Sequence, residues 1–517
     1  MDLNLPPKKM NDDRLSNMPD EILHHIIALL PTAEAASTCF LSRRWRYLWK
    51  YFHTLDFDET LDVRKLKRLV NQMLRGHHHS IDLESFRLRM DLDTTSYKEN
   101  DFLLQLDEWV RRVVMYNVRK LDLMLWGVRV LYRLPRCVVG SGLITTLRLT
   151  NCGFEDTGII NLVSLRKLCL RKVEIATSTM REVISNCLVL EYLHLDLCDK
   201  MEALEGRSLS LKSIKVMKCY NLKNFRMDIP NIELFKFHNG TSPFVNQCQF
   251  RKLKIVSLVA EINNAMLRDL TSKCLLLEDL SLVRCTILNQ IKISNDRLKR
   301  LKLCNCNELK TVELDAMGLK YFEYVGKEVV ELTQFNTPSK VEVRIELNEC
   351  KIEPDKLKTF LGMFNHVKLV TLVSDAAESV LIPEELLENS LPPLYHLTHL
   401  NFKARSKPNS DRYLKILNGV LSLSVHLEIL AIVLGSLYIN LKFEPKKTVD
   451  LQDFPNLNWT ELPLEHLRCR LNQVDILDNG RRNKEIHQLV AFILGENAGN
   501  VDMSVIYTSN SFSWKAI

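Results

Sequence analysis

The sequence has few of the features that mark catalytic proteins. Glycine accounts for only 16 of 517 residues, which leaves little material for glycine-rich loops that cradle phosphates. There is no G-x-x-x-x-G-K-[ST] loop, no G-x-S-x-G nucleophile elbow, no H-E-x-x-H zinc helix and no kinase signature set. These absences argue against the enzyme classes that such motifs define. We therefore expect a non-catalytic chain without a cofactor.

No apolar run is long enough to cross a bilayer. The most apolar stretch, Val425 to Ile439, is interrupted by His426, Glu428 and Gly435, and it falls short of the roughly 20 apolar residues that a transmembrane helix needs. The segment Met1 to Arg14 has an early acid and no apolar core, unlike a secretory signal. We expect a soluble protein of the cytoplasm or nucleus, without membrane partners.

An excess of charge of one sign is also lacking. Lysine and arginine total 70 and aspartate and glutamate 63, a formal net charge of +7. Over this length the excess is mild and does not by itself call for a nucleic acid or an anionic membrane. The chain is 46% hydrophobic and 26% charged, as in ordinary globular proteins, and its length predicts about three domains.

The segment from Asp13 to Lys50 predicts three short helices. Pro31 would end the first, because proline cannot continue a helix, while Thr32 and Ser42 can cap the second (33–40) and the third. Apolar residues recur at helical spacing, namely Ile22, Leu23, Ile26, Ile27 and Leu30 in the first helix and Trp45, Leu48, Trp49 and Phe52 in the third. Three small helices cannot bury this apolar load alone, so it either packs on the following domain or docks a partner.

This segment resembles an F-box of the plant type that precedes leucine-rich repeats. The positions that match the family signature are Pro19, Asp20, Glu21, Ile22, Leu23, Ile26, Leu30, Pro31, Thr32, Ala35, Thr38, Leu41, Ser42, Arg44, Trp45, Arg46, Leu48 and Trp49. Met18 stands where the family usually has leucine, and Leu55 to Asp58 match the segment that commonly follows. The resemblance implies docking on an Skp-type adaptor. We assign the adaptor contacts to Leu15, Pro19, Ile22, Leu23, Ile26, Leu30, Pro31, Leu41, Ser42, Trp45, Leu48 and Trp49.

The middle of the chain repeats the template Leu-x-x-Leu-x-Leu, with apolar substitutes. Copies start at Val118, Ile144, Leu165, Leu190, Leu211, Ile232, Leu253, Leu277, Leu298 and Leu319. Their spacing of 21 to 26 residues is typical of leucine-rich repeats, in which each unit adds one short strand and buries its apolar face by stacking. Two longer units are predicted to carry helices, at 179–185 and 266–272. The 21-residue units have room only for extended or 3₁₀ segments there.

Seven of the 14 cysteines hold fixed places in this repeat. Cys152, Cys198, Cys219, Cys285 and Cys306 fall eight residues after a repeat start, and Cys187 and Cys274 fall three residues before one. We expect these to be small core residues in a reducing compartment and not metal ligands. The run His77-His78-His79 is predicted to be an exposed loop, since three adjacent histidines cannot all face one ion.

Side chains between the buried leucines would line the concave side of the sheet, which solenoids use to bind partners. We expect this surface to hold a protein substrate, and its slight basic bias would suit an acidic or phosphorylated segment. The candidates are Lys120, Arg148, Lys167, Arg171, Tyr192, His194, Lys215, Lys236, His238, Arg300, Lys302 and Tyr321.

The last third of the chain loses the 21-residue rhythm but keeps apolar strand signals, at 369–373, 397–402 and 427–432. A connector is predicted from Lys442 to Pro455. Beyond it we expect a strand at 471–477, a helix at 483–496 and a last strand near 500–507. This end resembles the FBD module that closes many plant F-box repeat proteins. The matching residues are Pro463, Leu467, Val474, Ile476, Gly480, Leu489, Phe492, Asn497 and Ala498.

The predicted fold class is α/β. It comprises a three-helix F-box (10–58), a connector and N-terminal cap (59–115), a horseshoe-like leucine-rich-repeat solenoid with a parallel sheet (116–345), an irregular repeat-like region (346–460) and an α/β FBD-like module (461–510). The resemblance implies a substrate-receptor subunit of an Skp–cullin–F-box type ubiquitin ligase, joined through the adaptor to a cullin and its RING subunit. The alternatives are a repeat scaffold not coupled to ubiquitination and a small-molecule sensor. Nucleic-acid binding is the weakest alternative, because the basic residues are dispersed.

Overall fold

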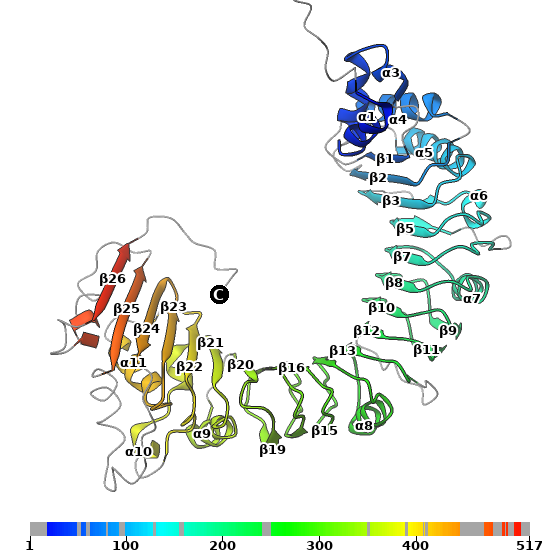
Figure 1. Cartoon of the computed structure of the whole chain (residues 1–517). Coiled ribbons are helices and arrows are strands. Elements are labelled where there is room, and N and C mark those ends of the chain that lie inside the picture. Colours follow the sequence, from blue (N-terminus) through cyan, green and yellow to red (C-terminus); the bar gives the residue numbers. More distant parts are fainter. Residues whose placement is uncertain are drawn as a thin grey trace, which may run out of the picture. The chain divides into compact units, whose positions relative to one another are not determined.

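The computed structural model describes most of the chain, in two compact units, Met1–Phe250 and Arg251–Ile517. The described residues are 18–30, 32–48, 53–57, 63–78, 81–91, 99–127, 131–154, 160–239, 250–348, 352–387, 391–406, 408, 412–444, 470–478, 489–491, 493–494 and 501–507. Each unit has its own run of stacked strands, which is visible in Figure 1.

The first unit opens with the short helices that the sequence predicts. They are α1 (Asp20–Ala28), α2 (Thr32–Ser37), the 3₁₀ turn η1 (Thr38–Phe40) and α3 (Trp45–Leu48). The predicted second helix is thus split, because it changes to 3₁₀ after Ser37. Thr32 was expected to cap this helix but lies in its first turn, and its hydroxyl accepts the backbone N–H of Asp56 at 2.7 Å. This hydrogen bond ties the helices to the first strand of the sheet.

A parallel sheet runs through the first unit. Its strands pair in the order β1 (Thr54–Phe57), β2 (Ser85–Asp91), β3 (Lys120–Trp126), β5 (Thr146–Thr150), β7 (Lys167–Arg171), β8 (Tyr192–Asp196), β10 (Ser213–Met217) and β12 (Leu234–His238). The pairings are in register, so side chains at the same place in each repeat form rows across the strands. One such row is fully buried: Leu121, Leu147, Leu168, Leu193, Ile214 and Phe235. Sheet pairing begins at β1, well before residue 116.

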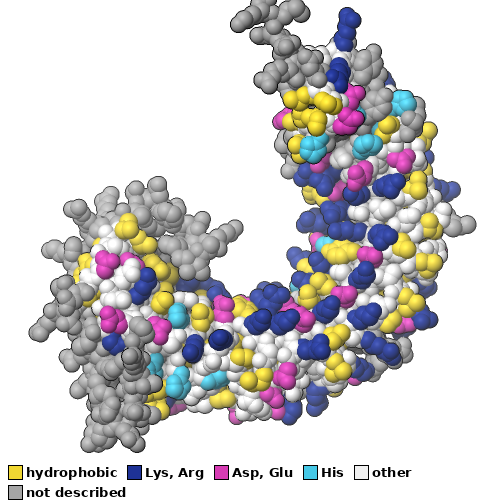
Figure 2. Space-filling model, viewed as in Figure 1, with side chains coloured by type: hydrophobic (Ala, Val, Ile, Leu, Met, Phe, Trp, Pro, Cys, Tyr) yellow, Lys and Arg dark blue, Asp and Glu magenta, His cyan; other side chains and the backbone are white. Residues whose placement is uncertain are grey.

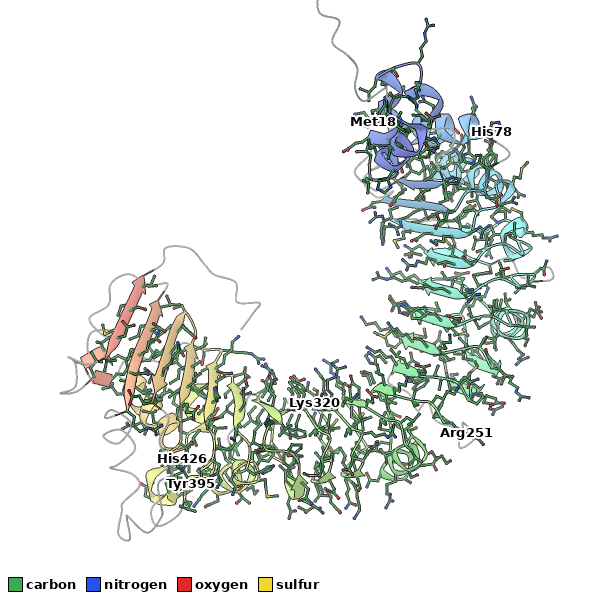
Figure 3. The ribbon with its side chains drawn as sticks, in the orientation of Figure 1. Met18, His78, Arg251, Lys320, Tyr395 and His426 are labelled. Carbon is green, nitrogen blue, oxygen red and sulfur yellow. The ribbon has the colours of Figure 1, made fainter. Side chains whose placement is uncertain are left out.

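Two amphipathic helices cover the start of this sheet. They are α4 (Val63–Gly76) and α5 (Glu99–Met115), and the buried Trp109 of α5 donates its indole N–H to Asn71 of α4 at 2.9 Å. The histidine run differs from the prediction. His77 is buried and its ring packs 4.8 Å from that of Tyr116, whereas His78 is exposed (Figure 3). His79 lies outside the described residues.

On the side of each repeat away from the sheet, the structure depends on the length of the repeat, as expected. The first unit's longer repeat carries α7 (Thr177–Asn186), and its shorter repeats carry the small parallel pair β9 (Ala203–Arg207) and β11 (Asn224–Asp228). Shorter elements on this side are β4 (Tyr132–Arg133), α6 (Arg136–Val139) and β6 (Cys152–Gly153). The seven repeat cysteines are buried, which confirms them as core residues.

The second unit continues the same pattern and then departs from it. Its parallel strands are β13 (Ile255–Val259), β14 (Asp279–Val283), β16 (Arg300–Cys304), β18 (Tyr321–Gly326), β20 (Glu342–Leu347), β21 (Leu369–Ser374), β22 (His399–Ala404) and β23 (Ile429–Leu434). On the other side lie α8 (Asn264–Lys273), β15 (Gln290–Ser294), β17 (Thr311–Asp315), β19 (Glu331–Asn336), α9 (Pro354–Gly362), η3 (Ala377–Val380), α10 (Glu384–Leu387) and α11 (Tyr413–Leu421). In this unit the rings of Tyr395 and His426 pack 4.8 Å apart (Figure 3).

The C-terminal strands extend this second sheet. β24 (Leu437–Phe443) pairs antiparallel with β23, β25 (Leu471–Asp478) antiparallel with β24, and β26 (Asp502–Tyr507) parallel with β25. Two strands of the predicted FBD-like end are therefore confirmed. The predicted connector is partly wrong, because Lys442 and Phe443 belong to β24, and residues 445–469 lie outside the described part. Of the predicted helix 483–496, only 489–491 and 493–494 are described, as helical.

Candidate interaction surfaces

The predicted adaptor-binding residues divide into buried and exposed groups. Leu23, Trp45 and Leu48 are buried, together with Ile27 and Ala35, and so form the core of the helical segment. A side chain inside this core cannot also lie on a docking surface of the folded chain. Pro19, Ile22 and Leu41 are exposed, and Ile26, Leu30 and Ser42 are partly buried. Leu15, Pro31 and Trp49 lie outside the described residues.

The local geometry explains how this core is held. Arg44, just before α3, forms an ion pair and hydrogen bonds with Asp20 in the first turn of α1. The Ser42 hydroxyl accepts the backbone N–H of Trp45 at 3.4 Å, so Ser42 caps α3 as predicted. These contacts join the two ends of the helical segment and fix which apolar side chains face outward.

Among the described residues of this segment, four large apolar side chains remain exposed. Ile22 is 48% exposed, Leu29 74%, Phe40 85% and Leu41 60%, and Figure 2 shows apolar side chains at the surface of this segment. Sequence reasoning missed Leu29 and Phe40. The spacing contained a usable signal for Leu29, because Ile22, Ile26 and Leu29 form one helical stripe, next to the stripe of Leu23, Ile27 and Leu30. We call Ile22, Leu29, Phe40 and Leu41 the helical apolar surface.

The twelve predicted substrate-binding side chains all lie on sheet strands and alternate with buried residues, so each is at least partly exposed. We call this side of each sheet its open face. In the first unit its central row runs Asp56, Arg87, Asp122, Arg148, Cys169, His194, Lys215 and Lys236.

The first half of this row is a ladder of opposite charges. Arg87 lies 3.0 Å from Asp56 and 3.3 Å from Asp122, and Arg148 lies 3.8 Å from Asp122. Burial raises the pKa of Asp122, and Arg87 and Arg148 oppose that shift. Lys120, at the start of β3, is likewise neutralised by Glu84 at 2.8 Å.

The second half of this row and the strand positions beside it carry basic side chains. No acidic side chain among the described residues forms an ion pair with Lys167, Lys215 or Lys236, although Arg171 pairs with Asp196 at 3.3 Å. The Tyr192 ring lies between two of these lysines, with Lys167 Nζ 4.7 Å and Lys215 Nζ 5.3 Å from its centroid. We call Lys167, Tyr192, His194, Lys215, Lys236 and His238 the basic patch.

Burial, together with nearby positive charge, lowers the pKa values of the two histidines of the basic patch. Burial holds the pKa of His194 below its ordinary value, and Lys215, Arg171 and Lys167 act in the same direction, against Asp196. Burial and Lys236 likewise lower the pKa of His238. Both side chains are therefore mainly neutral at pH 7 and can donate or accept one hydrogen bond.

On the open face of the second unit, acidic side chains neutralise the two predicted basic residues. Arg300 lies 2.8 Å from Asp279, and Lys302 lies 2.7 Å from Glu323. The Lys302 ammonium also sits 5.2 Å from the Tyr321 ring centroid. Burial and Glu323 raise the pKa of Tyr321. The structure thus brings the three predicted residues together, with acidic partners that sequence reasoning did not assign.

Other kinds of site find little support in the described part of the chain. No group of three His, Cys, Asp or Glu side chains there could hold a metal ion. Burial raises the pKa of Cys187 and of Cys274 to about 12, so these thiols stay protonated and are poor nucleophiles at neutral pH. No helix within the described ranges is both long and apolar enough to cross a membrane.

Comparison with known proteins finds matches for both the N-terminal helical segment and the repeats. Residues 15–56 match the F-box domain model, and residues 74–258 and 238–477 match the model described as At1g61320/AtMIF1, LRR domain. The Arabidopsis thaliana F-box/FBD/LRR-repeat protein At5g56420 is 26% identical over 57% of this chain and 71% of its own length. F-box/LRR-repeat protein 13 of the same species is 30% identical over 38% of this chain and 45% of its own length.

Two further relatives are matched over a limited part of their length. Two Arabidopsis thaliana F-box/LRR-repeat proteins, At3g28410 and At5g02700, are 34% and 33% identical, and each alignment covers 36% of this chain and 38% of the relative. A solved structure, the LRR ectodomain of the plant receptor kinase GASSHO1/SCHENGEN3, aligns over 74% of this chain and 53% of its own at 13% identity, with a TM-score of 0.27.

Proposed function

Because the chain belongs to the F-box/LRR-repeat proteins, we propose that it is the substrate-receptor subunit of an Skp–cullin–F-box type ubiquitin ligase in the cytoplasm or nucleus. F-box domains in general bind Skp-type adaptors, which would join this chain to a cullin and its RING subunit. The repeats would hold a protein substrate. The chain performs no covalent step itself. It raises the effective concentration of substrate lysines near the activated ubiquitin.

The helical apolar surface is the observation that supports this proposal most directly. Ile22, Leu29, Phe40 and Leu41 stay exposed although a separate core of Leu23, Ile27 and Trp45 is already packed. Exposed apolar side chains that gather on one small module usually mark a protein interface. Large side chains at the centre of such interfaces each contribute about 2 kcal/mol or more to binding. We therefore assign Phe40 and Leu29 as the main adaptor contacts.

Calorimetric titration of the full chain with purified Skp-type adaptors tests this assignment. The Leu29→Ala, Phe40→Ala double variant should bind at least tenfold more weakly, with an unchanged circular dichroism spectrum. A matched control is Leu188→Ala, which removes an equally exposed leucine (78%) from a repeat loop and should leave binding unchanged. Failure of the folded wild-type chain to bind any of several adaptors would contradict the proposal.

A core variant separates folding from docking. Leu23→Ala removes a fully buried side chain, and such changes cost about 2–5 kcal/mol of stability. It should weaken adaptor binding only together with a loss of helical signal. If Leu23→Ala kept the native spectrum and abolished binding, Leu23 would be a contact and the division between core and surface would be wrong.

Ubiquitin transfer separates the ligase from a scaffold. The chain, adaptor, cullin and RING subunit are combined with ubiquitin and its activating and conjugating enzymes, and ubiquitination of the chain itself is followed. We expect transfer that depends on the adaptor and is lost in the Leu29→Ala, Phe40→Ala variant. Adaptor binding without any assembly on the cullin would favour the scaffold alternative.

A further inference from the structure

We propose that the basic patch on the open face of the first unit binds a phosphorylated segment of the protein substrate. This inference rests on the substrate-receptor function proposed above and names the chemistry that the repeats recognise. The proposed site is centred on Lys215 of β10 and Lys236 of β12. Lys167 of β7 provides a third, more distant positive charge.

Lys215 and Lys236 are direct partners in the register of β10 and β12. Paired strands lie about 4.8 Å apart, so the two side chains leave the sheet side by side. Like charges placed directly opposite each other on a sheet are destabilising. No acidic side chain in the described part of the chain forms an ion pair with either lysine. The arrangement therefore carries an electrostatic penalty that a bound anion would remove.

The other predicted basic side chains show what a purely structural arrangement looks like. Lys302 on β16 faces Glu323 on β18 at the equivalent register, and their side chains meet at 2.7 Å. Arg148 faces Asp122 in the same way, at 3.8 Å. At both of these positions an acid stands opposite the base. At Lys215 that place is occupied by a second lysine.

A phosphate group fits this pair better than a single carboxylate does. Phosphoserine and phosphothreonine carry a charge of about −1.5 to −2 at pH 7 and three acceptor oxygens, so one group can neutralise both ammonium groups. The Tyr192 ring packs beside Lys215 at 5.3 Å and limits its freedom before binding. His194, the row neighbour of Lys215 on β8, can add a hydrogen bond.

The position of Lys167 predicts a second feature of the segment. Lys167 lies two strands from Lys215, on the adjacent row, which corresponds to a distance of roughly 12 Å from the strand spacing and rise. An extended peptide advances about 3.3 Å per residue. An acidic residue three or four positions from the phosphorylated one would therefore reach Lys167.

The aromatic side chains of the basic patch favour a protein segment over a nucleic acid as the ligand. Single-stranded nucleic acids bind to grooves in which several aromatic side chains stack on successive bases. In the basic patch the aromatic side chain beside the lysines is Tyr192, and both Lys167 and Lys215 lie within 5.3 Å of its ring centroid. The described residues therefore offer no row of aromatic side chains next to the lysine pair on which successive bases could stack.

Fluorescence anisotropy with the full chain tests the proposal. The probe is a library of labelled 12-residue peptides with one central phosphoserine, a glutamate three or four residues away and mixed residues elsewhere. The same library without phosphate, the library with alanine for glutamate, inorganic phosphate and a single-stranded RNA are the comparison arms. We expect the phosphorylated library to bind at least tenfold more tightly than the unphosphorylated one, and loss of the glutamate to weaken binding severalfold.

The Lys215→Gln, Lys236→Gln double variant should lose at least tenfold in affinity for the phosphorylated library. The matched control is Lys302→Gln, a lysine on the open face of the second unit that Glu323 already neutralises, and its affinity should equal that of the wild type. Equal binding of both libraries, no binding, or unchanged binding by the double variant would each overturn the proposal. So would tighter binding of the RNA, or inorganic phosphate that competes as well as the peptide.

Adaptor titration on the same preparations separates the two proposals. The double lysine variant should bind the adaptor normally, because its substitutions lie on the repeats. If the wild type binds phosphopeptides but no adaptor, the ligase function fails and the phosphate site stands. If it binds the adaptor but no phosphopeptide, only the phosphate site fails.

Discussion

At the scale of single residues, the partner decides what a side chain does. Lys236 and Lys302 occupy the same kind of strand position, but only Lys302 has a carboxylate within 2.7 Å. Leu23 and Leu29 lie six residues apart in or beside one helix, yet one is in the core and the other is 74% exposed. In each pair the residue type is the same, so the residue type cannot explain the difference in ion pairing or in burial. Both follow from what the fold places opposite the side chain.

Trp109 allows a residue-level prediction of stability. Trp109→Phe keeps most of the buried ring but loses the 2.9 Å hydrogen bond from Nε1 to Asn71, which leaves the Asn71 carbonyl oxygen without this donor. Such a loss costs about 1–3 kcal/mol. We expect a lower urea midpoint for unfolding, followed by circular dichroism. Leu104→Ala, on an exposed site of the same helix, should change it little, and equal effects of the two would refute the role of the hydrogen bond.

At the scale of elements, one residue with positive φ ends many of the repeat strands. Asn151, Lys172, Leu197, Lys218, Arg284 and Asn305 directly follow β5, β7, β8, β10, β14 and β16, with φ between 48° and 55°. In five of the six repeats, all except that of Lys172, the next residue is the buried repeat cysteine, so the turn redirects the chain into the core. Left-handed conformations disfavour residues with a Cβ by about 1–2 kcal/mol, so these turns hold strain.

Lys172 makes this strain measurable. Lys172→Gly should raise stability by up to about 1 kcal/mol, because relief of the left-handed strain exceeds the entropy that glycine loses on folding. Lys172→Val should lower stability, since a β-branched residue suits φ of 48° even less. The control is Lys320→Gly, at an exposed lysine without positive φ, which should be destabilising. Urea midpoints that rank glycine below lysine at residue 172 would contradict the account.

At the scale of the whole molecule, both units share a sensitivity to acid. Burial lowers the pKa of His194 and His238 in the first unit and of His366 in the second. Groups with a depressed folded-state pKa bind protons more readily in the unfolded chain. The free energy of unfolding is therefore unaffected by them above about pH 6.5, and it falls as the pH drops through their lowered pKa values.

This linkage predicts a lower urea midpoint at pH 5.5 than at pH 7.5, in a range where carboxylates with ordinary pKa values stay ionised. The triple variant His194→Gln, His238→Gln, His366→Gln should show a flatter dependence on pH. A midpoint that rises on acidification, or a triple variant with the same slope as the wild type, would show that these histidines do not govern the response.

Prediction from sequence succeeded where the signal is local or periodic. The repeat period located the strands and the buried cysteines, and the family signature located the helical segment at the N-terminus. It was less successful with the histidine run and the connector at Lys442, where no period applies. His77 is buried because Tyr116 lies against it, and Lys442 is in a strand because β23 and β25 flank it. Tyr116 and β25 are both distant in the chain from the residues that they contact.

The amino-acid sequence by itself determined the stacking of repeats, since apolar residues spaced 21 to 26 apart can be buried only against copies of themselves. It also determined the composition of the open face. Only the tertiary structure decided which charges there are neutralised and which apolar side chains of the helical segment face outward. Ion pairing requires two side chains to meet within a few ångströms, and the in-register pairing of strands sets which ones do. That register places Glu323 beside Lys302 and Lys236 beside Lys215.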